Sequence, residues 1–86
     1  MSYEKEYEIG GEKIVLKPLT VDEGIDIVLE MSDDEKRQTA VRKLIVETLK
    51  KNGKTLKDFS MKQFTDLAEA VLDVNGLNKD KDGKQK

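Results

Sequence analysis

The stretch that decides the fold is YEKEYEIGGEKIVLKPLTVDE, residues 3–23, which joins an alternating pattern, a glycine pair and a helix start. Tyr7 and Ile9 fall on one side of an extended chain, and the glutamates between and beside them fall on the other. Gly10-Gly11 supplies the positive φ angles that a tight turn requires. The stretch therefore predicts an antiparallel β-hairpin over residues 3–18.

Side-chain chemistry fixes the register of this hairpin. A turn at the two glycines sets apolar residues opposite each other and acids opposite bases, and a slip of one residue would mix the two faces. Pro18 then ends the second strand. The expected pairs are Ile9 with Glu12, Glu8 with Lys13, Tyr7 with Ile14, and Lys5 with Leu16.

Three helices are predicted after the hairpin. Each begins at a hydroxyl N-cap with an acid or amide three residues later, and these caps are Thr20, Ser32 and Ser60. Asn52-Gly53 and Asn75-Gly76 place glycine where a helix end needs a left-handed residue. The helices are expected over residues 21–31, 33–51 and 61–75, with one further helical turn between 54 and 59 that points Leu56 and Phe59 inward.

Apolar stripes on these helices predict the core. They recur at spacings of three and four residues, as on helices that bury one side. The stripes are Val21, Ile25, Val28 and Leu29; Val41, Leu44, Ile45, Thr48 and Leu49; and Phe64, Leu67, Ala68, Val71 and Leu72. Packed with one face of the hairpin, they predict a small α+β domain over residues 1–77, mainly helical, followed by a disordered charged tail over 78–86.

The amino-acid composition excludes several classes of function. The chain has 86 residues, 16 basic and 18 acidic, with no cysteine and no histidine. Disulfides, thiolate or imidazole metal ligands and the commonest general base are therefore excluded. A net charge of −2 gives no reason to expect nucleic acid or an anionic membrane as partner, and no apolar run is long enough to span a bilayer. We expect a non-catalytic cytoplasmic protein without cofactor or metal.

The terminal NKDKDGKQK, residues 78–86, resembles the first half of a calcium-binding EF-hand loop. Such a loop needs a bidentate glutamate at its twelfth position, and this chain stops before that position. No calcium site is predicted there.

Some apolar residues lie away from the predicted core stripes. They are Ile27, Met31, Val46, Met61 and Val74, and Ile27 with Met31 makes the first helix apolar on two sides. Several such residues on a small chain favour a surface that binds a partner, either another protein or a second copy of the chain. The alternative is a core that wraps around, in which the hairpin covers the second side of the first helix.

Two strings resemble a known family. Residues 14–23, IVLKPLTVDE, and residues 71–77, VLDVNGL, resemble the start and the last helix of tail assembly chaperones from long-tailed bacteriophages or prophages. The resemblance implies a non-catalytic protein of the host cytoplasm that coats and solubilises the tape measure protein, helps recruit tail tube subunits, and is not retained in the mature virion. In many such families a ribosomal frameshift near the end of the short product makes a longer form, and the lysine-rich end is compatible with one.

A different class of protein is also considered. The second and third helices, separated at Asn52-Gly53, suggest a small regulatory or nucleic-acid-binding protein of the helix-turn-helix type. The long interval before Ser60 and the absence of a basic face argue against it.

Overall fold

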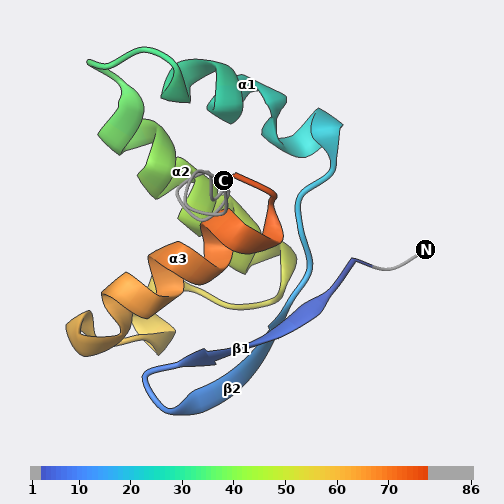
Figure 1. Ribbon diagram of the computed structural model, residues 1–86, viewed down its shortest axis with the longest axis vertical. Helices are drawn as coiled ribbons and strands as arrows, with labels where there is room; N and C mark the ends of the chain where they lie inside the picture. The colour runs from blue at the N-terminus through green and yellow to red at the C-terminus, as the bar shows by residue number, and fades with distance from the viewer. Residues whose placement is uncertain (1–2, 78–86) are drawn as a thin grey trace, which may run out of the picture.

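A computed structural model describes residues 3–77 and contains a two-stranded hairpin followed by three α-helices (Figure 1). The predicted α+β class is therefore confirmed, whereas the tail predicted for 78–86 lies outside the described residues. In chain order the elements are β1 (Lys5–Ile9), β2 (Glu12–Leu16), α1 (Val21–Met31), α2 (Arg37–Lys51), the 3-10 turns η1 (Leu56–Asp58) and η2 (Met61–Gln63), and α3 (Phe64–Val74).

The hairpin has the predicted antiparallel register, from Lys5 opposite Leu16 to Ile9 opposite Glu12. Its turn is fastened to the start of α3. The Gly10 N–H donates to the Asp66 carboxylate at 3.1 Å, and the Gln63 amide donates to the Ile9 carbonyl at 3.2 Å. These bonds hold β1 against α3, the helix that covers the hairpin in Figure 1.

Helix α1 has the predicted bounds because its N-cap works as the sequence indicates. The Thr20 hydroxyl accepts from the Glu23 N–H at 3.3 Å, and the Glu23 carboxylate accepts from the Thr20 N–H at 2.8 Å. Two N–H groups at the helix start thereby gain partners.

Helix α2 begins at Arg37, so the predicted start at residue 33 is wrong. Ser32 ends α1 instead of capping α2, because its hydroxyl donates to the Leu29 carbonyl at 2.8 Å. The Asp33 carboxylate accepts from the Glu35 N–H at 3.0 Å, which fixes a local turn in place of a helical one. A serine that the sequence predicts as the N-cap of one helix is thus the C-cap of the helix before it.

The third helix also begins later than residue 61. The Ser60 N–H donates to the Gln63 side chain at 2.8 Å, as the capping pattern predicts, but the turn that follows is the 3-10 turn η2. The α-helical part runs from Phe64 to Val74.

Both asparagine-glycine pairs end helices as predicted, and Gly53 and Gly76 have φ angles of 73° and 74°. After α2, the Lys54 N–H donates to the Leu49 carbonyl at 2.8 Å, and after α3 the Leu77 N–H donates to the Leu72 carbonyl at 2.8 Å. These bonds define the glycine-terminated helix end known as the Schellman motif.

The two asparagines before these glycines hold the segment that leads from β2 to α1. The Asn52 side chain accepts from the Lys17 N–H at 2.9 Å and donates to the Lys17 carbonyl at 3.1 Å. The Asn75 side chain accepts from the Leu19 N–H at 2.8 Å and donates to the Thr48 hydroxyl at 3.1 Å. An irregular segment and the ends of two helices are thereby fixed together.

One hydrophobic core joins the hairpin and all three helices. The predicted stripe of α2 is confirmed, with Val41 half-buried and the rest buried, including Thr48, whose hydroxyl accepts the bond from Asn75. In α3 the stripe is buried or half-buried except Phe64, which is exposed. The buried apolar residues are Ile9, Leu16, Ile27, Ala40, Leu44, Ile45, Leu49, Leu67, Ala70 and Val71.

In α1 the predicted core stripe is wrong. Its inner side consists of Gly24, Ile27 and Met31, whereas Val21 and Leu29 are 76% and 64% exposed. Helix α1 packs chiefly against α2, and its inner side meets the core through Ile27 and Met31, with Gly24 buried beside Leu19. The side of α1 with Ile27 and Met31, which the wrap-around alternative expects to be covered, is indeed buried or half-buried, but α1 packs chiefly on α2, whereas the hairpin packs on α3.

Candidate partner-binding surfaces

Of the five residues predicted to bind a partner, Met61 alone is exposed, at 83%. Ile27 is 8% exposed and belongs to the core, and Met31 and Val74 are half-buried against that core. Val46 is half-buried on α2. The structure therefore corrects the predicted surface at Ile27, Met31, Val46 and Val74, and does not bring the five residues together.

A long apolar groove takes the place of that surface. It lies between the first half of α2 and the turns η1 and η2, and has a volume of about 670 Å³. Met61 and the 47%-exposed Phe64 lie along it together with Leu56, which faces the groove instead of the core. The apolar side chains that line it are Val41, Ile45, Leu56, Phe59, Met61, Phe64 and Leu67.

One feature of the sequence indicates this groove, although the apolar stripes of the helices do not include it: a cluster of large apolar residues before the third helix. Leu56, Phe59, Met61 and Phe64 lie within nine positions, on two short turns and the first residue of α3. Short turns cannot bury so many large side chains on one core-facing side, so part of this cluster must be exposed. Only Phe59 of the two residues predicted to point inward from this region packs on the core.

The second apolar surface is the outer face of α1, formed by Val21, Ile25, Val28 and Leu29. Val21, Ile25 and Val28 are separated by four and three positions, so that they lie along one side of the helix. Beside this row, a cleft of about 260 Å³ runs between α1 and the end of α3, with Leu44, Asn75 and Leu77 among its lining residues.

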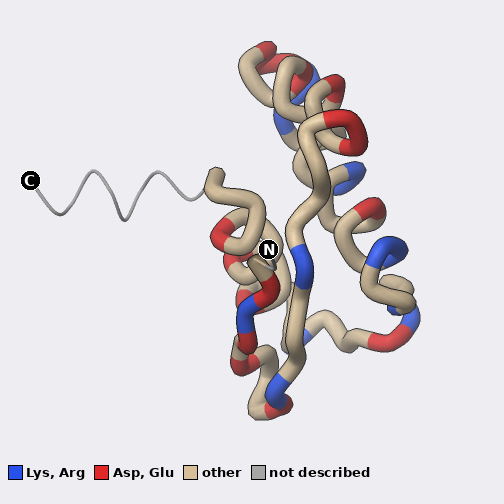
Figure 2. The backbone as a smooth tube through the Cα atoms, turned by 90° about the vertical axis from the view of Figure 1, so that its right-hand side faces the viewer, with Lys and Arg blue, Asp and Glu red and all other residues tan. Residues whose placement is uncertain are grey.

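The two apolar surfaces carry opposite charges at their edges. Arg37 and Arg42 line the groove, and no acidic side chain is among its described lining residues. Asp22 and Asp26 follow the row Val21, Ile25 and Leu29 along one edge of the α1 outer face, at about 100° of rotation per residue. Along the chain the two kinds of charge lie in separate stretches, coloured red and blue in Figure 2. Every charged residue from Asp22 to Glu35 is acidic, whereas nine of the eleven from Lys36 to Lys62 are basic.

Two ion pairs fix α1 to α2 next to these aspartates, since Glu30 continues the row Asp22, Asp26 at a spacing of four residues. Lys51 contacts Glu23 at 2.8 Å, and Lys43 contacts Glu30 at 3.1 Å. The hydrogen bond from Lys51, followed by that from the Thr20 N–H, lowers the pKa of the exposed Glu23 carboxyl. Glu23 and Glu30 of α1 are thus paired within the chain.

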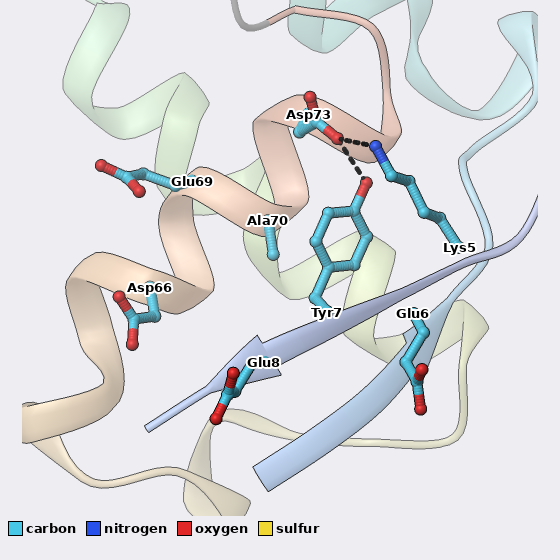
Figure 3. A pocket seen from close by; sticks show the side chains of 8 residues that line it. All are labelled: Lys5, Glu6, Tyr7, Glu8, Asp66, Glu69, Ala70 and Asp73. Atoms are coloured by element: carbon cyan, nitrogen blue, oxygen red, sulfur yellow. Dashed lines mark hydrogen bonds and ion pairs between the residues drawn. The ribbon is translucent and has the colours of Figure 1, made fainter. Parts of the chain in front are cut away.

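A smaller polar pocket of about 290 Å³ lies between β1 and α3 (Figure 3). There Tyr7 and Lys5 both reach Asp73, the phenol donating at 2.7 Å and the ammonium at 3.1 Å. Partial burial, then the hydrogen bond to Asp73 and its negative charge, raise the pKa of Tyr7 well above its ordinary value. Asp66 and Glu69 line the same pocket, which is acidic overall.

This pocket has no arrangement suited to a metal. Among residues 3–77 no three acidic, histidine or cysteine side chains come close enough together to hold a metal ion.

The helices of this part of the chain are also too short or too polar to cross a membrane. The features of residues 3–77 best suited to binding are therefore the groove and the α1 outer face.

No protein-family model, curated protein sequence or solved structure matches this chain.

Proposed function

We propose that this protein is a non-catalytic assembly chaperone of bacteriophage tails. It binds the tape measure protein, keeps it soluble and helps recruit tail tube subunits in the host cytoplasm, and it is not retained in the mature virion. The observation that carries this proposal is the large apolar groove, along which Leu56, Met61 and Phe64 are exposed.

The chemistry of the groove supports a protein as ligand. An amphipathic helix binds by laying its apolar face into such a groove, with charged residues at the rim selecting the partner. A tape measure protein is a long helical chain, and its apolar faces need cover until the tube surrounds it. The abundant surface charge of this domain would keep the complex in solution.

Nucleic-acid binding is less well supported. The interval between α2 and α3 contains two 3-10 turns instead of the short turn of a helix-turn-helix, and the acids of α1 and α3 flank the basic residues of α2. Salt-dependent binding of this protein to duplex DNA would favour that alternative.

The chaperone proposal is tested by co-expression with the tape measure protein of the same genome. We expect the tape measure protein to be insoluble alone and to form a soluble complex with this chain. Replacing Leu56 and Met61 together by glutamate should remove the complex, because charges would enter the apolar groove.

The matched control is the pair Lys57→Glu and Lys62→Glu on the same turns, which changes exposed charges outside the groove lining. This control should leave the complex intact. A tape measure protein that stays insoluble in the presence of the unaltered chain would contradict the proposed function.

A further inference from the structure

The groove and the α1 outer face are complementary in shape and in charge. One is an apolar hollow with two arginines at its rim, and the other is an exposed apolar helix face with two aspartates along one edge. We infer that the α1 outer face of one copy docks into the groove of a second copy. This association needs no tape measure protein and does not rest on the proposed function.

The apolar contacts suit a helix in a groove. Val21, Ile25 and Val28 occur at the spacing of four and three residues by which a helix presents anchors to a groove. Leu29 widens this row. Phe64 and Met61 offer the large, exposed side chains against which such anchors would pack.

The charges fit in number and in their spacing along the helix axes. With a rise of 1.5 Å per residue, Asp22 and Asp26 are about 6 Å apart along α1, and Arg37 and Arg42 are about 7.5 Å apart along α2. The two arginines differ by about 140° around α2 and therefore stand at opposite edges of the groove, and Arg42 stands at the edge tested below. Within residues 3–77, Asp22, Asp26 and Arg42 take part in no ion pair, whereas Arg37 contacts the exposed Asp34 and donates to the Met31 carbonyl at 3.2 Å.

A chain cannot satisfy its own groove in this way. Its α1 packs on α2 and is fixed there by the ion pairs of Glu23 with Lys51 and Glu30 with Lys43, and the lining of the groove shares no residue with the cleft beside the α1 outer face. The contact is therefore between copies and joins two different surfaces. Each pair of copies keeps one free groove and one free α1 outer face, so that association continues into a ring or an open chain of subunits.

The experiment is sedimentation velocity of the purified full chain over a range of concentrations, with two single-surface variants. In the face variant Val21 and Leu29 are replaced by glutamate, and in the groove variant Leu56 and Met61 are. Each change affects exposed side chains, so circular dichroism should show both variants folded. We expect the unaltered protein to grow in mass with concentration and each variant to remain a monomer.

Mixing the two variants gives the decisive result. The face variant retains an intact groove and the groove variant an intact α1 face, so the mixture should form a complex of one copy of each and grow no further. A mixture that stays monomeric would overturn the inference. So would an unaltered protein that stays monomeric at every concentration, which would leave the groove to a different protein.

The charged pairs are tested by reversal and rescue. Arg42→Asp should lower the association constant at least about tenfold, because like charges would then face each other. Adding Asp26→Arg to the same chain should restore association. Failure of this rescue, with both chains folded, would contradict the proposed arrangement of α1 in the groove.

Discussion

At the scale of single residues, Asn75 links three separate parts of the chain. Its side chain accepts from the Leu19 N–H and donates to the Val71 carbonyl and the Thr48 hydroxyl. Thr48 is fully buried, so a lost partner there would not be replaced easily by water. Asn75 therefore stabilises the route of the chain into α1 as well as the end of α3.

Replacing Asn75 by alanine should lower the free energy of unfolding by about 1–3 kcal/mol, because polar groups near the core lose their partners. Asn75→Asp retains an acceptor for Leu19 and loses the donors, so its loss should be smaller. Urea unfolding followed by circular dichroism measures both. An alanine variant as stable as the unaltered protein would show that Asn75 does not fix this segment.

Tyr7 makes the stability of the protein depend on pH in the alkaline range. Its phenol has a raised pKa in the folded protein, so the unfolded chain releases that proton first as the pH rises. The stabilisation by the protonated phenol is complete below its ordinary pKa of about 10, and it is lost as the pH rises above that value.

We expect the urea midpoint of the unaltered protein to fall between about pH 8 and pH 10.5 by more than that of Tyr7→Phe, since phenylalanine has no proton to lose. Tyr3→Phe is the matched control, because Tyr3 lies two residues before β1 and is 69% exposed. Equal alkaline losses in Tyr7→Phe and the unaltered protein would contradict the role of the Tyr7–Asp73 bond.

At the scale of elements, α1 shows how one amphipathic pattern can be read in two ways. Both of its sides are apolar, and the row Val21, Ile25 and Val28 has the spacing typical of a buried stripe. The structure buries the other side, with Ile27 in the core and Gly24 buried beside Leu19. No local pattern in the sequence separates the two sides.

The assignment of the two sides is tested by a pair of alanine variants. Ile27→Ala should lower the free energy of unfolding by about 2–5 kcal/mol, as for other buried aliphatic side chains. Leu29→Ala should change it by no more than about 0.5 kcal/mol, because that side chain is exposed. Urea unfolding of both variants checks this. The reverse order of the two losses would restore the side predicted from the sequence.

The start of α2 has a similar explanation. Ser32 and Glu35 have the spacing of a capping box, but Ser32 bonds back to Leu29 at the end of α1. The Ser32 hydroxyl cannot bond to the end of α1 and cap the start of α2 at the same time. It bonds to the end of α1, and α2 therefore begins at Arg37 without a side-chain cap.

At the scale of the whole molecule, apolar surface is distributed over two sides of a domain whose core is already closed. The α1 arm lies on α2 at one end of the domain, and the hairpin lies under α3 at the other (Figure 1). The groove and the cleft beside the α1 outer face share no lining residue, so one copy can use both surfaces at once. Self-association and binding of a tape measure protein would then compete for the same apolar surface.

The sequence by itself determined the hairpin with its register, the bounds of α1, the glycine-ended helices and the buried stripe of α2. Each depends on residues a few positions apart or joined by one tight turn, where backbone geometry leaves few choices. The tertiary structure alone decided which side of α1 is buried, how Asn52 and Asn75 fasten the chain, and where the groove opens. These features depend on contacts between residues far apart in the sequence, and the packing of α1 on α2 chooses between its two apolar sides, which no local pattern can do.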